Sequence, residues 1–208
     1  MYGIDNYSGF LISGIILNIT PGSDTIYILA RSISQGKRAG YVSVLGISTG
    51  CLFHTLLASF GLSILLSRSP WAFNIIKYLG VAYLLYIGAK MFFQKNNVLN
   101  NRSLQVASVT ISRIYYQGLL TNVLNPKVAL FFLSFLPQFI NPEVTNGTIP
   151  FILLGCTFML TGTIWCFFLV LVASTMSQTL RENTQIVLIM QKISGLVFVG
   201  LGLRIILS

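Results

Sequence analysis

The chain has 208 residues, of which 54% are hydrophobic and 8% are charged, and its mean hydropathy is +0.80. A water-soluble protein of this length cannot bury so much apolar surface, so the composition excludes a soluble domain and predicts an integral membrane protein. The net charge of +9 would suggest nucleic-acid binding in a soluble protein. Here we interpret it as charge that flanks membrane spans, and we expect the lipid bilayer and no nucleic acid as a partner.

Six apolar segments are long enough to cross a membrane, because about 20 apolar residues span a hydrocarbon core of roughly 30 Å. The chain before the first of them contains Asp5 but no Lys or Arg, unlike a signal peptide, so we expect that segment to be retained. The sequence thus predicts an all-α membrane protein with six transmembrane helices in one domain, 1–208. The segments lie near residues 9–33, 40–66, 71–93, 113–140, 148–174 and 186–207.

The first and fourth segments are interrupted near their middles by helix-breaking residues. The interruptions read Asn18-Ile-Thr-Pro21-Gly22-Ser23-Asp24 and Asn122-Val-Leu-Asn125-Pro126-Lys127. Proline lacks an N–H and glycine relaxes the backbone, so each helix is expected to end and restart there, near the membrane midplane. Backbone groups exposed inside a bilayer need partners from protein, water or ligand, and paired breaks therefore indicate a substrate site.

Both ends of an amino-acid zwitterion are suited to such breaks. The positive end of a restarting half-helix favours a carboxylate, while the freed carbonyls of the preceding half favour an ammonium or a cation. A proline kink repaired by neighbouring helices is the alternative. The candidate substrate-binding residues are Asn18, Thr20, Pro21, Gly22, Asp24, Asn122, Asn125, Pro126 and Lys127.

Two titratable residues are candidates for proton coupling. Asp24 is the only acidic residue within any apolar segment, and His54 is the only histidine. Titratable groups inside a membrane are functional hypotheses by default. The alternatives are a helix N-cap for Asp24 and a histidine satisfied by a Thr or a backbone carbonyl for His54. Lys127 is either a partner of Asp24, a counter-charge for a substrate carboxylate, or a snorkelling flank residue.

The two halves of the chain are weakly similar. Lys77-Tyr-Leu-Gly80 with Gly88-Ala-Lys90 recurs as Lys192-Ile-Ser-Gly195 with Gly202-Leu-Arg204. Repeats of about 1–93 and 113–208, joined by a polar loop at 94–112, would hold three spans each, so the second would enter the membrane from the opposite side. Nine of the 13 basic residues fall on one side of this inverted-topology repeat, which predicts outward N- and C-termini.

Glycines and cysteines complete the sequence patterns. Gly46 and Gly50 form a G-x-x-x-G pair that predicts close helix packing and leaves a homodimer possible. The cysteines have no C-x-x-C spacing, and with one His and four acidic residues we expect no metal site and no cofactor. Cys51, Cys156 and Cys166 are interpreted as packing residues.

Six stretches of the chain are specific in combination: Asn18–Asp24, Leu29–Gly40, Gly46–Gly50, Tyr78–Gly88, Gly118–Lys127 and Phe135–Phe139. Together they resemble the LysE/RhtB family of bacterial amino-acid exporters. The resemblance implies that the protein is not an enzyme but a multi-pass exporter in the bacterial cytoplasmic (inner) membrane. It further implies that homoserine, threonine, leucine or a related small amino acid is moved outward by the proton-motive force, with protons as the second partner.

Two other classes of function are weighed against an exporter. A membrane thiol-disulfide conductor of the CcdA/DsbD kind shares broken helices and inverted repeats, but it needs a redox cysteine in each of the segments equivalent to the first and fourth. Neither segment contains one. An uncoupled channel would differ from an exporter in transport against a gradient, measured with and without an uncoupler.

Overall fold

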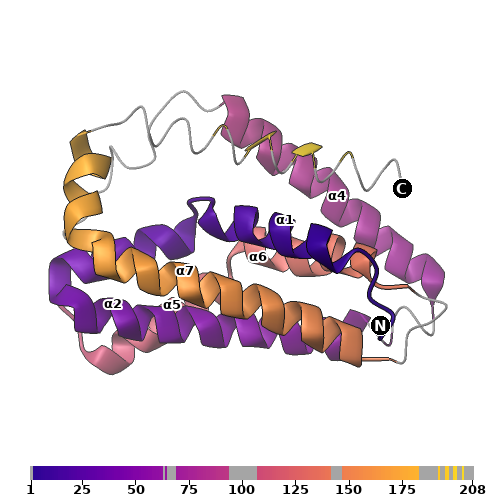
Figure 1. Cartoon of the computed structure of the whole chain (residues 1–208), viewed down its shortest axis with the longest axis horizontal. Coiled ribbons are helices and arrows are strands. Elements are labelled where there is room, and N and C mark those ends of the chain that lie inside the picture. The colour runs from indigo at the N-terminus through magenta and orange to yellow at the C-terminus, as the bar shows by residue number, and fades with distance from the viewer. Residues whose placement is uncertain are drawn as a thin grey trace.

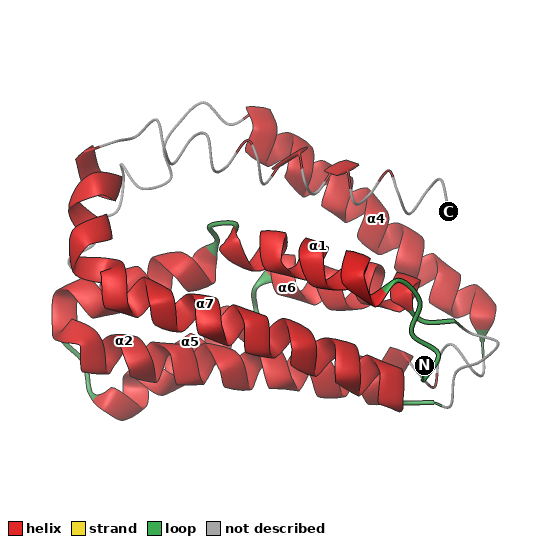
Figure 2. Cartoon of the chain, viewed as in Figure 1, coloured by secondary structure: helices red, strands yellow, loops and turns green. Residues whose placement is uncertain are grey.

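The computed structural model describes residues 2–62, 64, 69–93, 107–141 and 147–182, together with six single positions between 192 and 203. The regular structure of this part is helical, which confirms the predicted all-α class (Figure 2). Most of the sixth predicted segment, 186–207, and most of the polar loop lie outside the described residues. The elements are α1 Tyr7–Ile19, α2 Ser23–Leu57, η1 Ala58–Leu62, α4 Pro70–Phe93, α5 Ile111–Val123, α6 Pro126–Leu130, η2 Phe131–Phe135, η3 Leu136–Phe139 and α7 Ile149–Glu182.

Long apolar helices place the protein in a membrane. Two helices, Ser23–Leu62 and Ile149–Ala173, are long and apolar enough to cross one. A third candidate is the pair Ile111–Val123 and Pro126–Phe139, whose halves are bent by 45° at a short break. The arrangement with six spans and an inverted repeat stays a prediction.

Both predicted breaks are present. α1 ends at Ile19 and α2 begins at Ser23, while α5 ends at Val123 and α6 begins at Pro126. Pro126 occupies the first turn of α6, where a missing N–H is harmless, and Asn125 caps that helix by accepting a bond from the Lys127 N–H at 3.0 Å.

One expectation and one alternative for the first break were wrong. Gly22 has φ −148° and ψ −168°, which is extended backbone that any residue adopts, so the break does not depend on glycine freedom. The residue at the N-cap of α2 is Gly22, with no side-chain cap bond, so Asp24 is not the cap. The lack of an N–H on Pro21 is what ends the helical bonding there.

α2 reverses its direction at Gly36. A straight helix over 23–62 would be about 60 Å long, roughly twice the hydrocarbon thickness. Gly36 has φ 82° and ψ 176°, and residues equally far from it on either side meet: a Cβ on Gly40 would collide with Ser32 Oγ. Residues 23–35 therefore complete the first segment, and residues 37–62 return as the second (Figure 1).

The first segment (residues 7–35) and the fourth segment (residues 111–139) lie antiparallel and side by side (Figure 1). At one end, the Asp5 N–H donates to Phe139 O at 2.9 Å. At the other end, Arg31 donates to Ala107 O at 3.0 Å and to Gln117 Oε1 at 2.8 Å. This opposite orientation is the one that an inverted repeat requires of these two segments.

Glycines let the second segment pack closely on α5. A Cβ on Gly46 would collide with Tyr115 O, and a Cβ on Gly118 would lie 2.9 Å from Ser43 O. A Cβ on Gly50 would lie 2.8 Å from the Cβ of Asn122. The predicted close packing of the G-x-x-x-G pair is confirmed, and its partner is α5 of the same chain. This packing sets the position of Asn122.

An aromatic core joins α1 to the far half of the fourth segment and to α7. Phe10 packs against Phe131 and Phe139, with ring centroids 5.7 and 5.3 Å apart. Phe131 in turn stacks on Phe158 of α7 at 4.0 Å. These rings are buried and fix α1 and α7 around the break of the fourth segment.

We predict that Gly36→Ala lowers the free energy of unfolding by about 1–3 kcal/mol, because the φ and ψ of Gly36 are nearly exclusive to glycine. No steric conflict contributes, since an added Cβ at Gly36 meets nothing within 4 Å. Thermal unfolding in detergent measures the change. The matched control is Gly61→Ala, where a Cβ also meets nothing within 4 Å and φ is not positive. Equal stability of the two variants would contradict the prediction.

Candidate functional site

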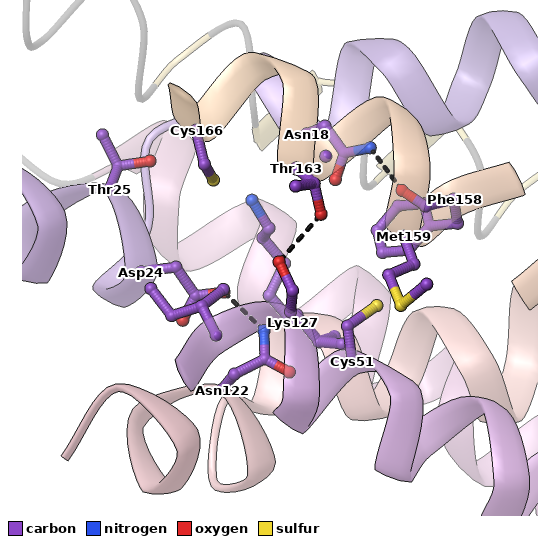
Figure 3. A pocket seen from close by; sticks show the side chains of 14 residues that line it. Asn18, Asp24, Thr25, Cys51, Asn122, Lys127, Phe158, Met159, Thr163 and Cys166 are labelled. Carbon is purple, nitrogen blue, oxygen red and sulfur yellow. Dashed lines mark hydrogen bonds between the residues drawn. The ribbon is translucent and has the colours of Figure 1, made fainter. Parts of the chain in front are cut away.

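The two breaks enclose a cavity of about 40 Å³, called here the site cavity (Figure 3). Helices α1, α2, α5, α6 and α7 all contribute side chains to it. It has room for water but is far smaller than an amino acid, so it must widen to take one. It is lined by Asn18, Asp24, Thr25, Ile47, Ser48, Cys51, Asn122, Lys127, Val128, Phe158, Met159, Gly162, Thr163 and Cys166.

Lys127 connects the break of the fourth segment to that of the first. Its ammonium donates to Leu17 O at 2.8 Å and to Thr20 O at 2.9 Å. These carbonyls belong to the last turn and the C-cap of α1, where intrahelical partners run out. Lys127 therefore lies at the first break, and it caps the end of α1.

Asp24 makes the reciprocal connection. Asn122 Nδ2 donates to Asp24 Oδ2 at 2.8 Å. In the described part of the chain Lys127 forms no ion pair with Asp24. The Asp24–Lys127 partnership, one of the alternatives for Lys127, is replaced by three hydrogen bonds to neutral groups. Each break thus supplies a side chain that satisfies the other.

Two buried acceptors at this site have no partner. They are Asp24 Oδ1 and Asn122 Oδ1, on the two residues joined by the hydrogen bond across the breaks. A buried acceptor without a donor is destabilising by about 1–3 kcal/mol, and by more when it is charged. The arrangement therefore suits a ligand that brings several N–H donors.

Helix α7 forms the wall opposite the breaks. Asn18 Nδ2 donates to Phe158 O at 3.2 Å and to Thr161 Oγ1 at 3.1 Å. The hydroxyls of Ser48 and Thr163 are 2.8 Å apart. Sequence reasoning missed Ser48 and Thr163 because neither lies at a break. A detectable signal was the polar run Thr161-Gly162-Thr163 inside an otherwise apolar helix.

His54 lies behind the site cavity. Its Nε2 is 3.2 Å from Asn122 O, and since a carbonyl only accepts, Nε2 carries the hydrogen. The ring stacks on Phe132 with centroids 5.7 Å apart and lines a separate, largely apolar cavity of about 430 Å³. The geometry is that of a histidine whose N–H is satisfied by a backbone carbonyl. Through this bond His54 helps to position Asn122, the residue that binds Asp24.

The nine predicted substrate-binding residues divide into two groups. Asn18, Asp24, Asn122 and Lys127 line the site cavity. The remaining five shape the breaks and are absent from its lining: Thr20, Pro21, Gly22, Asn125 and Pro126. No group of three metal-binding side chains occurs among the described residues.

The fold and the site define a helical membrane protein with two broken helices that share one cavity, on which Asp24 and Lys127 both lie. The family described as LysE type translocator matches residues 15–208. The chain belongs to this family and is therefore a membrane transporter, as the resemblance predicted. This membership favours a transporter over a thiol-disulfide conductor.

Relatives match along nearly the whole chain. The uncharacterized membrane protein YrhP of Bacillus subtilis (strain 168) is 37% identical over 195 residues, which cover 89% of this chain and 91% of that protein. The leucine efflux proteins of Klebsiella pneumoniae and Salmonella typhimurium are 30% and 29% identical, each covering 98% of this chain and 96% of the relative. No solved structure matches the chain.

We predict that Gly50→Ala impairs transport, because its Cβ would lie 2.8 Å from the Cβ and 2.9 Å from Oδ1 of Asn122. The third close neighbour is backbone, Leu119 O at 3.0 Å, so α5 itself must shift. We expect a loss of about 1–3 kcal/mol in stability, typical of overpacking, and a clear fall in transport rate. Gly61→Ala again serves as the control. Unchanged transport by Gly50→Ala would show that the position of Asn122 is not critical.

Proposed function

We propose that the protein exports small neutral amino acids through the site cavity. The observation that carries the proposal is that Asp24 and Lys127, which have opposite charges, line one cavity without pairing with each other. Such a site offers one charge to each end of a zwitterion. The leucine efflux proteins that match the whole chain support an amino acid as the substrate.

The substrate ammonium would donate to Asp24 Oδ1 and Asn122 Oδ1, the two acceptors without partners. Its carboxylate would accept from the Lys127 ammonium, which has three N–H bonds and uses two of them on α1. The Thr163 hydroxyl, on the α7 wall of the cavity, is a further donor.

The substrate side chain would contact an apolar part of the lining, which favours leucine or another aliphatic amino acid over a charged one. Homoserine and threonine are the next candidates, because Ser48 and Thr163 offer hydroxyl partners. The apolar lining consists of Ile47, Val128, Phe158 and Met159.

The transporter would work as two inverted repeats of three helices, with the site at their interface and the N-terminus outside the inner membrane. The antiparallel first and fourth segments support this arrangement. Support also comes from the third and sixth segments, because a Cβ on Gly195 would lie 2.6 Å from Gly88 O. Widening of the site cavity on alternate sides would then admit and release the substrate.

Proton coupling would centre on Asp24, with His54 positioning Asn122 behind it. Exchange of one proton across 100 mV supplies roughly 2.3 kcal/mol, which maintains a gradient of about fiftyfold for a neutral substrate. Such a gradient is ample for relieving an excess of an amino acid.

Inside-out vesicles test the proposal. Energised vesicles should accumulate labelled leucine, threonine or homoserine, and an uncoupler should abolish the accumulation. Equilibration without accumulation would instead indicate an uncoupled channel. The control is the rate of uptake by vesicles that lack the protein. If no amino acid in a broad panel exceeds this rate in vesicles that contain it, the proposed function is wrong.

We predict that Asp24→Asn weakens substrate binding about 10- to 150-fold, since a hydrogen bond to a charged group contributes about 1.5–3 kcal/mol. The Asn side chain still accepts the bond from Asn122, so insertion and folding should persist, whereas Asp24→Ala also leaves Asn122 Nδ2 without a partner. Exposed Asp5→Asn is the control with the same change of charge. Proton-driven transport at the full rate by Asp24→Asn would exclude titration of Asp24 as the coupling step.

We also predict the orientation in the membrane. In a background without cysteine, Asp5→Cys should react with an impermeant thiol reagent in intact cells, and Ser108→Cys should react only after permeabilisation. Both positions are exposed, so burial does not limit labelling. The reverse pattern would place the N-terminus in the cytoplasm.

A further inference from the structure

The end of α1 inside the membrane is a site that attracts cations. A helix C-terminus leaves carbonyls without intrahelical donors and carries about half a negative charge from the helix dipole. In transporters with broken helices, such ends and the unwound carbonyls that follow them coordinate Na⁺ or protons. α1 ends in this way at Ile19, and Thr20 is its C-cap.

A charged side chain already occupies that position. The Lys127 ammonium lies 2.8 Å from Leu17 O and 2.9 Å from Thr20 O, one carbonyl from the last helical turn and one from the cap. Its stem passes over the unwound backbone, since a Cβ on Gly22 would lie 3.6 Å from Nζ and 3.8 Å from Cδ. The ammonium therefore contacts the carbonyls that a free cation would bind.

The place of Lys127 on its own helix is independent evidence for this interpretation. Lys127 follows Pro126 in the first turn of α6, at the positive end of the helix dipole, where a cation is unfavourable. The carboxylate on the same cavity, Asp24, accepts from Asn122 and leaves Lys127 on backbone carbonyls. A lysine at this position is thus explained by the end of α1 and by neither its own helix nor an ion pair.

We propose that the Lys127 ammonium is a built-in cation that takes the place of a free monovalent cation at the broken first segment. The carrier would consequently work without Na⁺, a consequence that rests on the proposed function. The cation site itself does not rest on it. Removing the Lys127 side chain should leave the two carbonyls unbonded and a narrow space with the shape of that side chain. A small alkylammonium ion can fill this space.

Thermal unfolding of the purified protein in detergent tests the cation site without any transport. Lys127→Ala removes a propylammonium-shaped part of the side chain, so n-propylammonium chloride should raise its Tm saturably, by roughly 2–4 °C or more. Neutral 1-propanol should not raise it. Wild type should not respond to n-propylammonium, and neither should exposed Lys37→Ala, which loses the same charge elsewhere. Equal responses of all three proteins, or no response of Lys127→Ala, would overturn the proposal.

The wild-type protein provides a second test that does not depend on the folding of a variant. Replacing Na⁺ by choline should change neither its Tm nor its rate of amino-acid transport. A rise in Tm with Na⁺, or transport that requires Na⁺, would overturn the proposal. If no amino acid is transported but n-propylammonium still stabilises Lys127→Ala selectively, the proposed function fails and the cation site stands.

Discussion

Backbone carbonyls and charged side chains inside a bilayer need partners, and in this protein the two broken segments provide some of these partners for each other. Lys127, just after the second break, bonds the carbonyls that the first break leaves open. Asn122, just before the second break, bonds Asp24 after the first. Because the exchange uses one cation and one anion on neutral partners, both charges stay on the site cavity and remain unpaired with each other.

Close helix packing makes this exchange possible. Gly46, Gly50 and Gly118 let the second segment and α5 approach until backbone meets backbone, which brings Asn122 within reach of Asp24 and His54. The reversal at Gly36 returns the chain so that Ser48 faces the same cavity as Asp24. Small residues in this fold therefore position polar ones, and substitutions at glycines far from any ligand should affect transport.

The sequence predicted the breaks but not their mutual bonding. Pro21 and Pro126 leave a clear signal because a missing N–H inside an apolar run has few explanations. Which carbonyls Lys127 would reach depends on how two distant segments pack, and hydropathy carries no such information. The predicted segments 9–33 and 40–66 leave a reversal between them, and the structure has it there. Hydropathy did not predict that a single residue with positive φ, Gly36, makes this reversal. Thr163 was missed because its helix is continuous.

The walls of the site cavity differ in how they are held together. Helices α2 and α5 meet through their backbones, whereas α7 meets the site through side chains. Separating α2 from α5 would open voids along a glycine-lined interface, where nothing small enough can enter to replace the lost van der Waals contacts. α7 instead meets the site through amide and hydroxyl groups of Asn18, Ser48 and Thr163, whose bonds water can replace one for one. These polar bonds are the part of the α7 contact that water can take over when the cavity widens, whereas the stacking of Phe131 on Phe158 holds α7 to the fourth segment.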